Sequence, residues 1–476
     1  MEVCSSAREG LGAGRRARRS GSAALMALAA GTLALGTACS TALAGWSSPR
    51  YFANVPAYLS SGAWSALATD ARGDVVLAWR TMRQVGHGRG WYYDASVQVA
   101  LAQLGHGAIV RTVWRGSHAV VGGVSVAIDA RGALTVAWID APSSRSGANT
   151  VRAASRSTAG RWSAVQALGH SAAFYDASPK LAVAPDRELL LTWNGGSAVG
   201  VEAAWAAPGH RFAAPSVAGR ARGAAILEPA PSFDASGAAH VYGIVDCDHP
   251  TSRGVMLSTR PHKHGFLGPV VIAPAPAADL AVSFAAGGAA LAAWERTECS
   301  TLEPSPGVAV GRSMRAGVWQ RPAVLAPRAW SYRLTPVAAP TVGTVSWVGQ
   351  SFMPAAPQLL SASVDQRGSF SPATVPSTRV VPVARDAAGD VVLEDLLLAR
   401  EVSEGRTPGS QPAPPIAVQP AGAGAPEPAP LASFEGTPLV RSLSSDAIAV
   451  AGSGRNVALA WQSGASSRVT ISIWRP

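Results

Sequence analysis

The sequence predicts an all-β protein, a β-propeller of about eight four-stranded blades, with seven blades as the alternative. Three observations support this fold. An apolar run, a tight turn and a second apolar run recur about every 50 residues, which is the spacing of propeller blades. Each period has room for four short strands, and the two ends of the chain each carry part of one period. Long helices are not indicated, because no stretch keeps apolar residues at helical spacing.

The recurring turn has the form Asp-x-x-Gly, and the apolar run after it usually ends in Trp. The clearest copies run from Asp70 to Trp79 and from Asp129 to Trp138. Asp accepts hydrogen bonds from amides just downstream, and Gly supplies the positive φ that closes a hairpin. Weaker copies bring the number to eight. They lie at 185–193 (over a turn that looks shortened), 234–243, 287–294, 341–347, 386–393 and 452–461.

A second element, of the form G-x-W-S-x-P, lies between these hairpins. It is clearest at 160–163 and relaxed at 209–212, 265–266, 317–319 and 368–372. A strand-like run precedes each copy, so every period holds four strands. The segment 45–49 matches this fourth-strand element, and 469–474 matches a third strand. We therefore expect the N-terminal and C-terminal strands to pair and close the ring, which removes its open edges.

The first 44 residues predict a signal peptide, and 45–476 form the propeller domain. Basic residues at 15–19 precede an apolar stretch at 23–38, and Ala42-Leu43-Ala44 is an A-x-A cleavage site. We expect a secreted, extracytoplasmic protein without a transmembrane segment in its mature form. The alternative is a lipid anchor at Cys39, since the residues before it faintly match a lipoprotein box.

Two cysteines remain after cleavage, Cys247 and Cys299. Both follow corresponding second strands of neighbouring periods, so we expect a disulfide between adjacent blades; two free thiols are the alternative. The segment 403–430 is rich in Pro, Ala and Gly. Because this composition builds no core, we expect a flexible insertion within the seventh period.

Composition argues against a nucleic-acid partner. The formal charge is +11, but the five arginines and two glutamates before residue 45 contribute a net +3, which leaves about +8. The remaining basic residues form neither a run nor a stripe interleaved with aromatic residues. We expect a monomer with no nucleic-acid partner and no cofactor.

The Asp-x-x-Gly hairpins that end in Trp, together with the G-x-W-S strands, resemble the broad group of secreted, sialidase-like propellers with BNR-like repeats. The resemblance covers nearly all of the mature chain but is generic, because the S-x-D-x-G-x-T-W form of the Asp-box is not reproduced. Enzymes of this group use an arginine triad, a Tyr/Glu nucleophile pair and an Asp acid/base. The arginines of this chain do not identify a triad, so the resemblance assigns no catalytic residue.

Candidate catalytic residues lie after two corresponding strands. Asp246 and Asp248 follow one of them, and Glu295 and Glu298 follow its counterpart in the next period. Paired carboxylates of this kind act as acid and base in glycoside cleavage. The alternative is that they are polar loop residues beside the expected disulfide.

Histidines near the first pair of carboxylates are candidate metal ligands. His249 follows Asp248, and His262 and His264 form an H-x-H pair further along. Imidazole and carboxylate groups suit transition metals, although this spacing matches no known zinc module. Solvated loop residues are the alternative.

Candidate ligand-binding residues fall outside the strand register or just beyond it. Trp91, Tyr92 and Tyr93 lie in a long excursion of the first period, whereas most of the 15 Trp sit at repeated strand positions and are expected in the core. Arg80 and Asp140 lie just beyond the strands that end in Trp79 and Trp138. Loops from several blades would converge there.

These observations favour a non-enzymatic binding or scaffold module for a glycan, peptide or protein partner. A sialidase-like hydrolase or lyase acting on glycans is the alternative. The fold by itself does not distinguish the binding module from the enzyme.

Overall fold

The computed structural model describes residues 45–47, 50–54, 65–86, 92–103, 106–142, 148–172, 178–196, 198–220, 226–245, 254–273, 277–285, 289–296, 308–315, 317–326, 330–339, 343–350, 358–376, 380–385, 391–395, 416–419, 427–428, 448–450, 457–462 and 468–475. All of them belong to one compact unit, Leu43–Pro476. The expected signal peptide and the lipid-anchor alternative at Cys39 lie outside the described residues.

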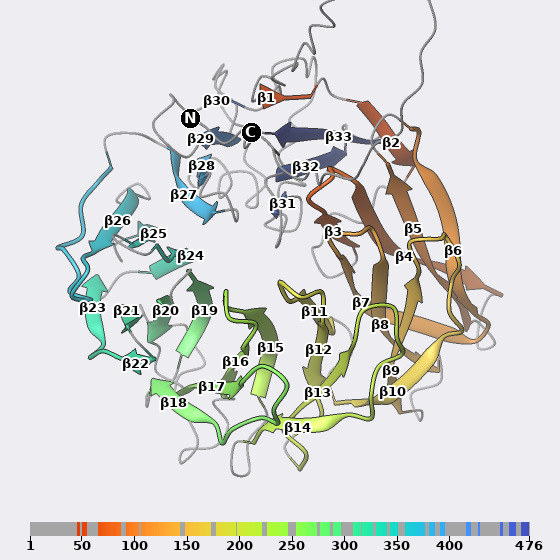
Figure 1. Ribbon diagram of the computed structural model, residues 1–476, viewed down its shortest axis with the longest axis horizontal. Helices are drawn as coiled ribbons and strands as arrows, with labels where there is room; N and C mark the ends of the chain where they lie inside the picture. The colour runs from red at the N-terminus through yellow and green to blue at the C-terminus, as the bar shows by residue number, and fades with distance from the viewer. Residues whose placement is uncertain are drawn as a thin grey trace, which may run out of the picture. The chain divides into compact units, whose positions relative to one another are not determined.

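The described residues form eight antiparallel sheets, numbered here sheet 1 to sheet 8 in chain order (Figure 1). Consecutive strands pair within a sheet, so each of the first four sheets is a meander. Their strands are, for sheet 1, β3 (Ser65–Thr69), β4 (Val75–Val85), β5 (Tyr92–Ala102) and β6 (Ile109–Gly116); for sheet 2, β7 (Ala119–Ile128), β8 (Leu134–Pro142), β9 (Asn149–Arg156) and β10 (Gln166–Ser171); for sheet 3, β11 (Lys180–Val183), β12 (Leu189–Asn194), β13 (Val201–Ala206) and β14 (Ser216–Gly219); and for sheet 4, β15 (Ile226–Phe233), β16 (Ala239–Val245), β17 (Gly254–Arg260) and β18 (Val270–Ala273).

The other four sheets follow the same order with small variations. In sheet 5 two short strands pair with the third strand, and sheet 6 has three strands among the described residues. The strands are, for sheet 5, β19 (Ala277–Phe284), β20 (Ala290–Arg296), β21 (Val308–Arg315), β22 (Val318–Trp319) and β23 (Ala323–Ala326); for sheet 6, β24 (Trp330–Val337), β25 (Gly343–Gln350) and β26 (Gln358–Val364); for sheet 7, β27 (Val380–Arg385), β28 (Val391–Asp395), β29 (Ile416–Gln419) and β30 (Glu427–Pro428); and for sheet 8, β31 (Ile448–Val450), β32 (Val457–Gln462), β33 (Arg468–Arg475), β1 (Gly45–Trp46) and β2 (Arg50–Asn54).

The two ends of the chain meet in sheet 8. β1 pairs with β33, with Gly45 opposite Arg475 and Trp46 opposite Trp474, and β2 pairs with the other half of β33. Neighbouring sheets contact one another mainly through their first strands. For example, β15 contacts β11 and β12, and β3 contacts β31 and β32 of the last sheet. The all-β prediction with four-stranded antiparallel sheets is confirmed. The number of blades and the closure of the ring stay predictions.

The first turn of sheet 1 has the chemistry that its sequence predicts. The Asp70 Oδ1 atom accepts hydrogen bonds from the amides of Arg72 and Asp74, both at 2.9 Å. Gly73 has a φ of 81°, which a residue with a side chain rarely adopts. Asp129 makes the same pair of hydrogen bonds in sheet 2. The side chain of Asp therefore fixes the turn, and Gly closes it.

The first turn of sheet 3 is not shortened, contrary to expectation. Its register leaves the same five residues between the strands as in sheet 1. The amide of Ala184 donates to the carbonyl of Glu188, and that of Arg187 to Ala184, both at 2.8 Å. Ala184 thus stands in the place of Asp70, and Arg187, with a φ of 72°, in the place of Gly73. The sequence pattern misplaced this turn because its backbone keeps the geometry without either marker residue.

The recurring Trp residues form the core, as expected. Each lies in the second strand of its sheet and packs among Val, Leu, Ile and Ala side chains. Replacing such a residue with Ala typically costs about 3–5 kcal/mol. The buried side chains are Trp79 (0% exposed), Trp138 (0%), Trp193 (1%), Trp294 (2%) and Trp347 (0%).

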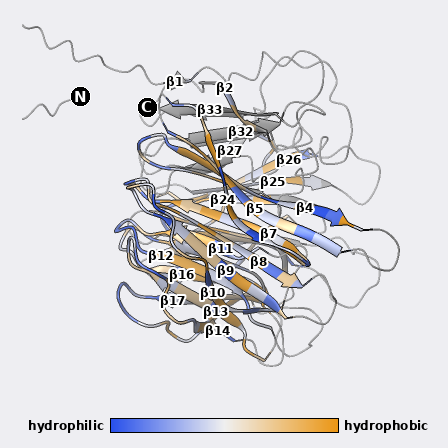
Figure 2. Cartoon of the chain, turned by 90° about the vertical axis from the view of Figure 1, so that its right-hand side faces the viewer, coloured by the Kyte–Doolittle hydropathy of each residue, from blue (hydrophilic) through white to orange (hydrophobic). Residues whose placement is uncertain are grey.

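The strands β4 and β5 are longer than their counterparts, and the outer end of β4 is polar. Side chains are buried from Val75 to Arg80 and become exposed at Arg83 and Gln84. Figure 2 shows this change as the hydrophilic end of β4. The expected loop after Trp79 is therefore strand.

The Pro/Ala/Gly-rich segment contains short strands. β29 and β30 fall inside 403–430, and β29 pairs with β28 from Ile416 opposite Glu394 to Gln419 opposite Val391. The short run Ile-Ala-Val-Gln thus pairs as a strand; apart from β30, the other residues of 403–430 lie outside the described residues, and the flexible insertion stays a prediction. Within the described part of the chain, no helix is long and apolar enough to cross a membrane.

Candidate functional site

Most of the sequence-predicted catalytic residues lie outside the described residues. Their roles stay predictions, as does the expected disulfide. The predicted residues outside the described part are the catalytic candidates Asp246, Asp248 and Glu298, the ligand-binding candidate Trp91, the metal candidate His249, and Cys247 and Cys299 of the expected disulfide. Glu295 is described and lies at the end of β20, where it is buried with 7% of its surface exposed.

Arg80 lies inside β4 rather than just beyond a strand, because β4 continues to Val85. Its side chain is 2% exposed. Its Nη1 donates to the carbonyl of Val121 and, at 3.1 Å, to that of Gly122. The guanidinium therefore links β4 of sheet 1 to β7 of sheet 2.

Asp140 likewise lies inside β8, which runs to Pro142. It is 7% exposed and accepts a hydrogen bond from Arg152 Nε at 2.5 Å. Burial raises the pKa of Asp140, while the hydrogen bond and charge of Arg152 act in the opposite direction. The structure thus gives both Arg80 and Asp140 partners within the fold.

The two described members of the expected aromatic patch lie at the start of β5. Tyr92 and Tyr93 are half-buried, and the Tyr92 ring stacks on His118 with 3.8 Å between ring centroids. Their role in ligand contact stays a prediction.

His262 is brought close to two carboxylates, though not to those that the sequence suggested. Asp186, Glu188 and His262 each place one ligand atom within 4.8 Å of the others. However, Arg260 Nη1 lies 2.9 Å from Glu188 Oε1, and a guanidinium keeps its positive charge. Because that cation already balances Glu188, we interpret the cluster as an ion-paired link between sheets 3 and 4. His264 is exposed and lies outside the cluster.

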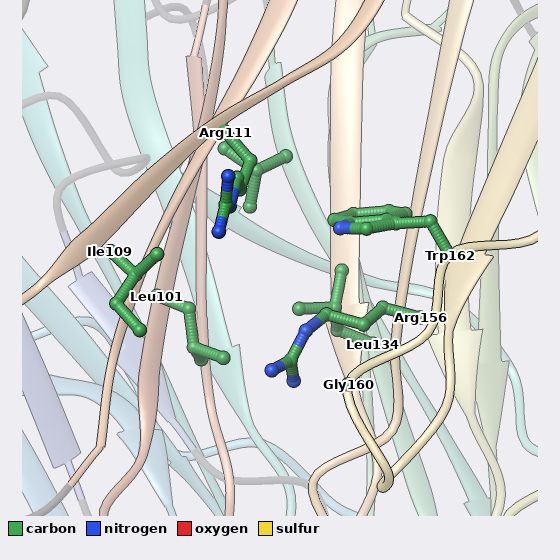
Figure 3. A pocket seen from close by; sticks show the side chains of 8 residues that line it. Leu101, Ile109, Arg111, Leu134, Arg156, Gly160 and Trp162 are labelled. Atoms are coloured by element: carbon green, nitrogen blue, oxygen red, sulfur yellow. The ribbon is translucent and has the colours of Figure 1, made fainter.

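A pocket of about 290 Å³ lies between sheets 1 and 2 (Figure 3). Sheet 1 contributes side chains from β5 and β6, and sheet 2 contributes them from β8, β9 and the turn after β9. The lining residues are Val99, Leu101, Ile109, Arg111, Leu134, Arg156, Gly160 and Trp162.

Strand alternation and one tight turn place the polar groups of the pocket. Ile109 and Arg111 share one face of β6, because alternate residues of a strand point the same way. Gly160, with a φ of 83°, closes the turn after β9, and a Cβ there would lie 3.2 Å from the Arg156 guanidinium. A backbone bridge between Arg156 and Trp162 then holds the indole beside that guanidinium.

The pocket carries positive charge without an internal counter-charge. Figure 3 shows the side chains of Arg111 and Arg156 pointing into the same space, with the Trp162 ring beside them. Among the described residues, no hydrogen bond or ion pair links either arginine to a carboxylate. The walls are otherwise apolar. Such a site can hold an anionic group next to a flat apolar face.

Sequence reasoning missed this pocket. Trp162 belonged to the recognised G-x-W-S element, but the two arginines come from different sheets, and most of the chain's arginines are unplaced by any motif. The usable signal was the Arg directly before the turn that leads to Gly160. That signal gains meaning only once β6 of the preceding sheet is known to lie opposite.

No family model and no curated protein matches the chain. Solved structures similar to it include the polysaccharide lyase Uly1, with a TM-score of 0.43, 10% identity, and coverage of 72% of this chain and 88% of that one. An α-L-arabinanase of Penicillium chrysogenum has a TM-score of 0.39 and 11% identity over 90% of this chain and 98% of that one. The intramolecular trans-sialidase of Ruminococcus gnavus has a TM-score of 0.34 and 10% identity over 72% and 92%. The likeness is one of fold.

Proposed function

We propose that the protein is an extracytoplasmic propeller that binds an acidic glycan in the pocket between sheets 1 and 2. The observation that carries the proposal is the pairing of Arg111 and Arg156 with the Trp162 indole around one cavity. Arginine presents a planar fork of donors that matches a carboxylate or a sulfate. The indole offers a flat apolar surface for the C–H face of a sugar ring.

The size of the pocket suits one sugar ring. Small-molecule sites typically measure about 300–1,000 Å³, and this cavity of about 290 Å³ is at the lower limit. A longer glycan would therefore place a single acidic unit in the pocket, with the rest of the chain lying across the exposed strand β6.

The lining residues favour binding over cleavage at this site. Hydrolysis of a glycosidic bond uses a pair of carboxyl groups as acid and base, and none of the described residues that line the pocket has one. A sialidase-like hydrolase or lyase would need its acid and base elsewhere in the chain. Binding without turnover is therefore the function that this geometry supports best.

Titration calorimetry of the mature protein tests the proposal. The ligands are a uronic-acid oligosaccharide, a sulfated oligosaccharide and a neutral one of equal length. We expect an acidic oligosaccharide to bind and the neutral one to bind at least tenfold more weakly. Arg156→Gln and Trp162→Ala should each lower the affinity at least tenfold.

The matched control is Arg161→Gln. Arg161 is exposed on the same turn, five residues after Arg156, but does not line the pocket. This variant should bind as the wild type does. Equal binding of acidic and neutral glycans, or equal losses in the Arg156 and Arg161 variants, would contradict the proposal. Release of shortened products during the titration would instead support the hydrolase or lyase.

A further inference from the structure

The arginine of the pocket has an exact counterpart two sheets further along the chain. Arg156 is the last residue of β9 and lies opposite Leu134, the first residue of β8. Arg260 is the last residue of β17 and lies opposite Ala239, the first residue of β16. The two guanidinium groups therefore start from the same register position, in sheet 2 and in sheet 4.

The preceding sheets, 1 and 3, also match position by position. Leu101 lies opposite the second residue of β4, and Trp205 lies opposite the second residue of β12. Asp74 directly precedes β4, and Glu188 directly precedes β12, after turns of equal length. Leu101 thus corresponds to Trp205, and Asp74 to Glu188.

At the interface of sheets 3 and 4, side chains of the protein itself contact the arginine. Glu188 Oε1 lies 2.9 Å from Arg260 Nη1, and the Arg260 guanidinium lies over the Trp205 ring, 4.7 Å from its centroid. The Arg260 side chain is only 6% exposed. A cavity at this interface measures only about 10 Å³, and Arg260 does not line it. A carboxylate and a flat ring fill the site.

At the interface of sheets 1 and 2 both of these groups are missing. Leu101 has no ring to cover Arg156. Asp74 is one methylene shorter than Glu188, and its Oδ2 is held at 2.6 Å by Arg72 of its own turn. Arg156 therefore faces the cavity without the carboxylate and ring that its counterpart receives.

We infer that the two interfaces are copies of one site encoded by the repeat, open between sheets 1 and 2 and filled by the chain itself between sheets 3 and 4. Glu188 and Trp205 then imitate the ligand, which presents a carboxylate to Arg156 beside a flat, mostly apolar ring. The inference rests on the proposed function and narrows it, because it selects a carboxylate over a sulfate.

The first experiment fills the open copy. Leu101→Trp places an indole where sheet 3 has Trp205, and it should weaken uronate binding at least tenfold in protein that still unfolds cooperatively. Val110→Trp is the matched control, since Val110 is exposed on β6 but lies on the face opposite Arg111. The inference fails if Leu101→Trp still binds uronate as the wild type does, or if both variants lose binding equally.

The second experiment opens the filled copy. The double variant Glu188→Gln/Trp205→Leu removes the internal carboxylate and ring from Arg260, so the number of bound uronate oligosaccharides should rise from one to two. The single variant Trp205→Leu keeps the ion pair and is used if the double variant does not fold. It should still bind one uronate oligosaccharide per chain. A stoichiometry of one in a folded double variant would overturn the inference while leaving the proposed function intact.

A third measurement separates the two failures completely. 3-Phenylpropanoate carries a carboxylate and a flat ring but is not a sugar. It should raise the melting temperature of the double variant, or of Glu188→Gln alone, by several degrees more than that of the wild type. If glycans fail to bind but this rescue is seen, the proposed glycan ligand falls, whereas the equivalence of the two interfaces and their preference for a carboxylate beside a ring stand. If sulfated and uronic-acid glycans bind the wild type equally, the carboxylate assignment falls and the function stands.

Discussion

The first turns of sheets 1 and 3 have the same length and the same backbone hydrogen bonds, but their charges face in opposite directions. In sheet 1, Arg72 binds Asp70 and Asp74 of its own turn, at 3.1 and 2.6 Å. In sheet 3, Arg187 reaches Asp129 of sheet 2 at 3.5 Å, and Glu188 reaches Arg260 of sheet 4. The repeat therefore determines the positions of the charged residues. The individual residues at those positions determine whether each charge pairs within its own turn or with a neighbouring sheet.

That difference has a functional side. In sheet 1 the arginine of the turn pairs with two carboxylates of the same turn. A turn that directs its charges outward links three sheets together and leaves no room. Under our proposal, the same backbone therefore forms a binding site at one interface and a structural link at the other.

The largest loss of stability in these tests is expected from Glu188→Ala. It leaves the buried Arg260 guanidinium without its carboxylate, and breaking a buried pair in this way costs about 3–5 kcal/mol. The matched change in sheet 1, Asp74→Ala, removes a pair whose arginine is half-exposed and should cost at most about 1 kcal/mol. Thermal unfolding followed by circular dichroism compares the two. Equal losses would show that the outward link does not hold the sheets together.

The next largest effect is expected from Asp70→Ala, which gives sheet 1 the residue found at this position in sheet 3. The amides of Arg72 and Asp74 lose their shared acceptor, which should cost about 1–2 kcal/mol. Asp70→Asn keeps an oxygen acceptor and should retain most of the stability. If Asp70→Ala leaves the free energy of unfolding unchanged, the backbone hydrogen bonds alone are sufficient to form both turns.

A third test uses pH at a buried histidine of sheet 4, His240, which lies in β16 and packs against sheet 5. His240 is 5% exposed, stacks on Phe284 at 4.3 Å and lies 3.2 Å from Asp234. Burial lowers the pKa of His240 below 6.5, although Asp234 opposes this shift. The unfolded chain therefore binds a proton at His240 more readily than the folded protein does. The contribution of His240 to the free energy of unfolding should be fully present above pH 6.5 and be lost as the pH falls below that value.

The pH profile of thermal unfolding checks this expectation, with His240→Gln as the variant that should flatten the fall. His264→Gln, at an exposed position, is the matched histidine variant for comparison. At lower pH a second loss should begin. Burial alone would raise the pKa of Asp234, but hydrogen bonds from Ser236, His240 and the Ala238 amide outweigh it and hold that pKa below 3.8. A flat wild-type profile between pH 5 and 7, roughly the range of histidine titration, would contradict the assignment.

The smallest effect is expected from Arg187→Gly. Gly removes the strain of a positive φ, worth about 1 kcal/mol, but also removes the ion pair with Asp129. The net change should lie within about 0.5 kcal/mol of zero, whereas Gly73→Arg in sheet 1 introduces the strain without a new partner and should be destabilising. Chemical unfolding midpoints of the two variants measure the difference.

The sequence predicts those features of this molecule that depend on neighbouring residues. The Asp70 turn and the buried Trp79 follow from the chemistry of short segments, and the pairing of Trp46 with Trp474 follows from matching each end to a place in the repeat. The turn of sheet 3 escaped because Ala184 and Arg187 keep its geometry without the marker residues. Arg80 and Asp140 were misplaced because the lengths of β4 and β8 depend on strand pairing, which no local pattern records.

The pocket could not be predicted for a different reason. Arg111 and Arg156 become a pair only when sheet 2 packs against sheet 1. Whether either arginine forms an ion pair depends on carboxylates far away in the sequence, such as Asp74, which pairs with Arg72 instead. Charge pairing across sheets is a property of the assembled fold.

The pairing of β1 with β33 has a consequence for how the chain folds. β33 is synthesised more than 400 residues after β1 and β2, so these two strands stay without that partner until β33 is available. Contacts between such distant segments close late and slowly, because the intervening loop must first be ordered. Loss of the last ten or so residues would leave exposed strand edges and a chain prone to aggregate.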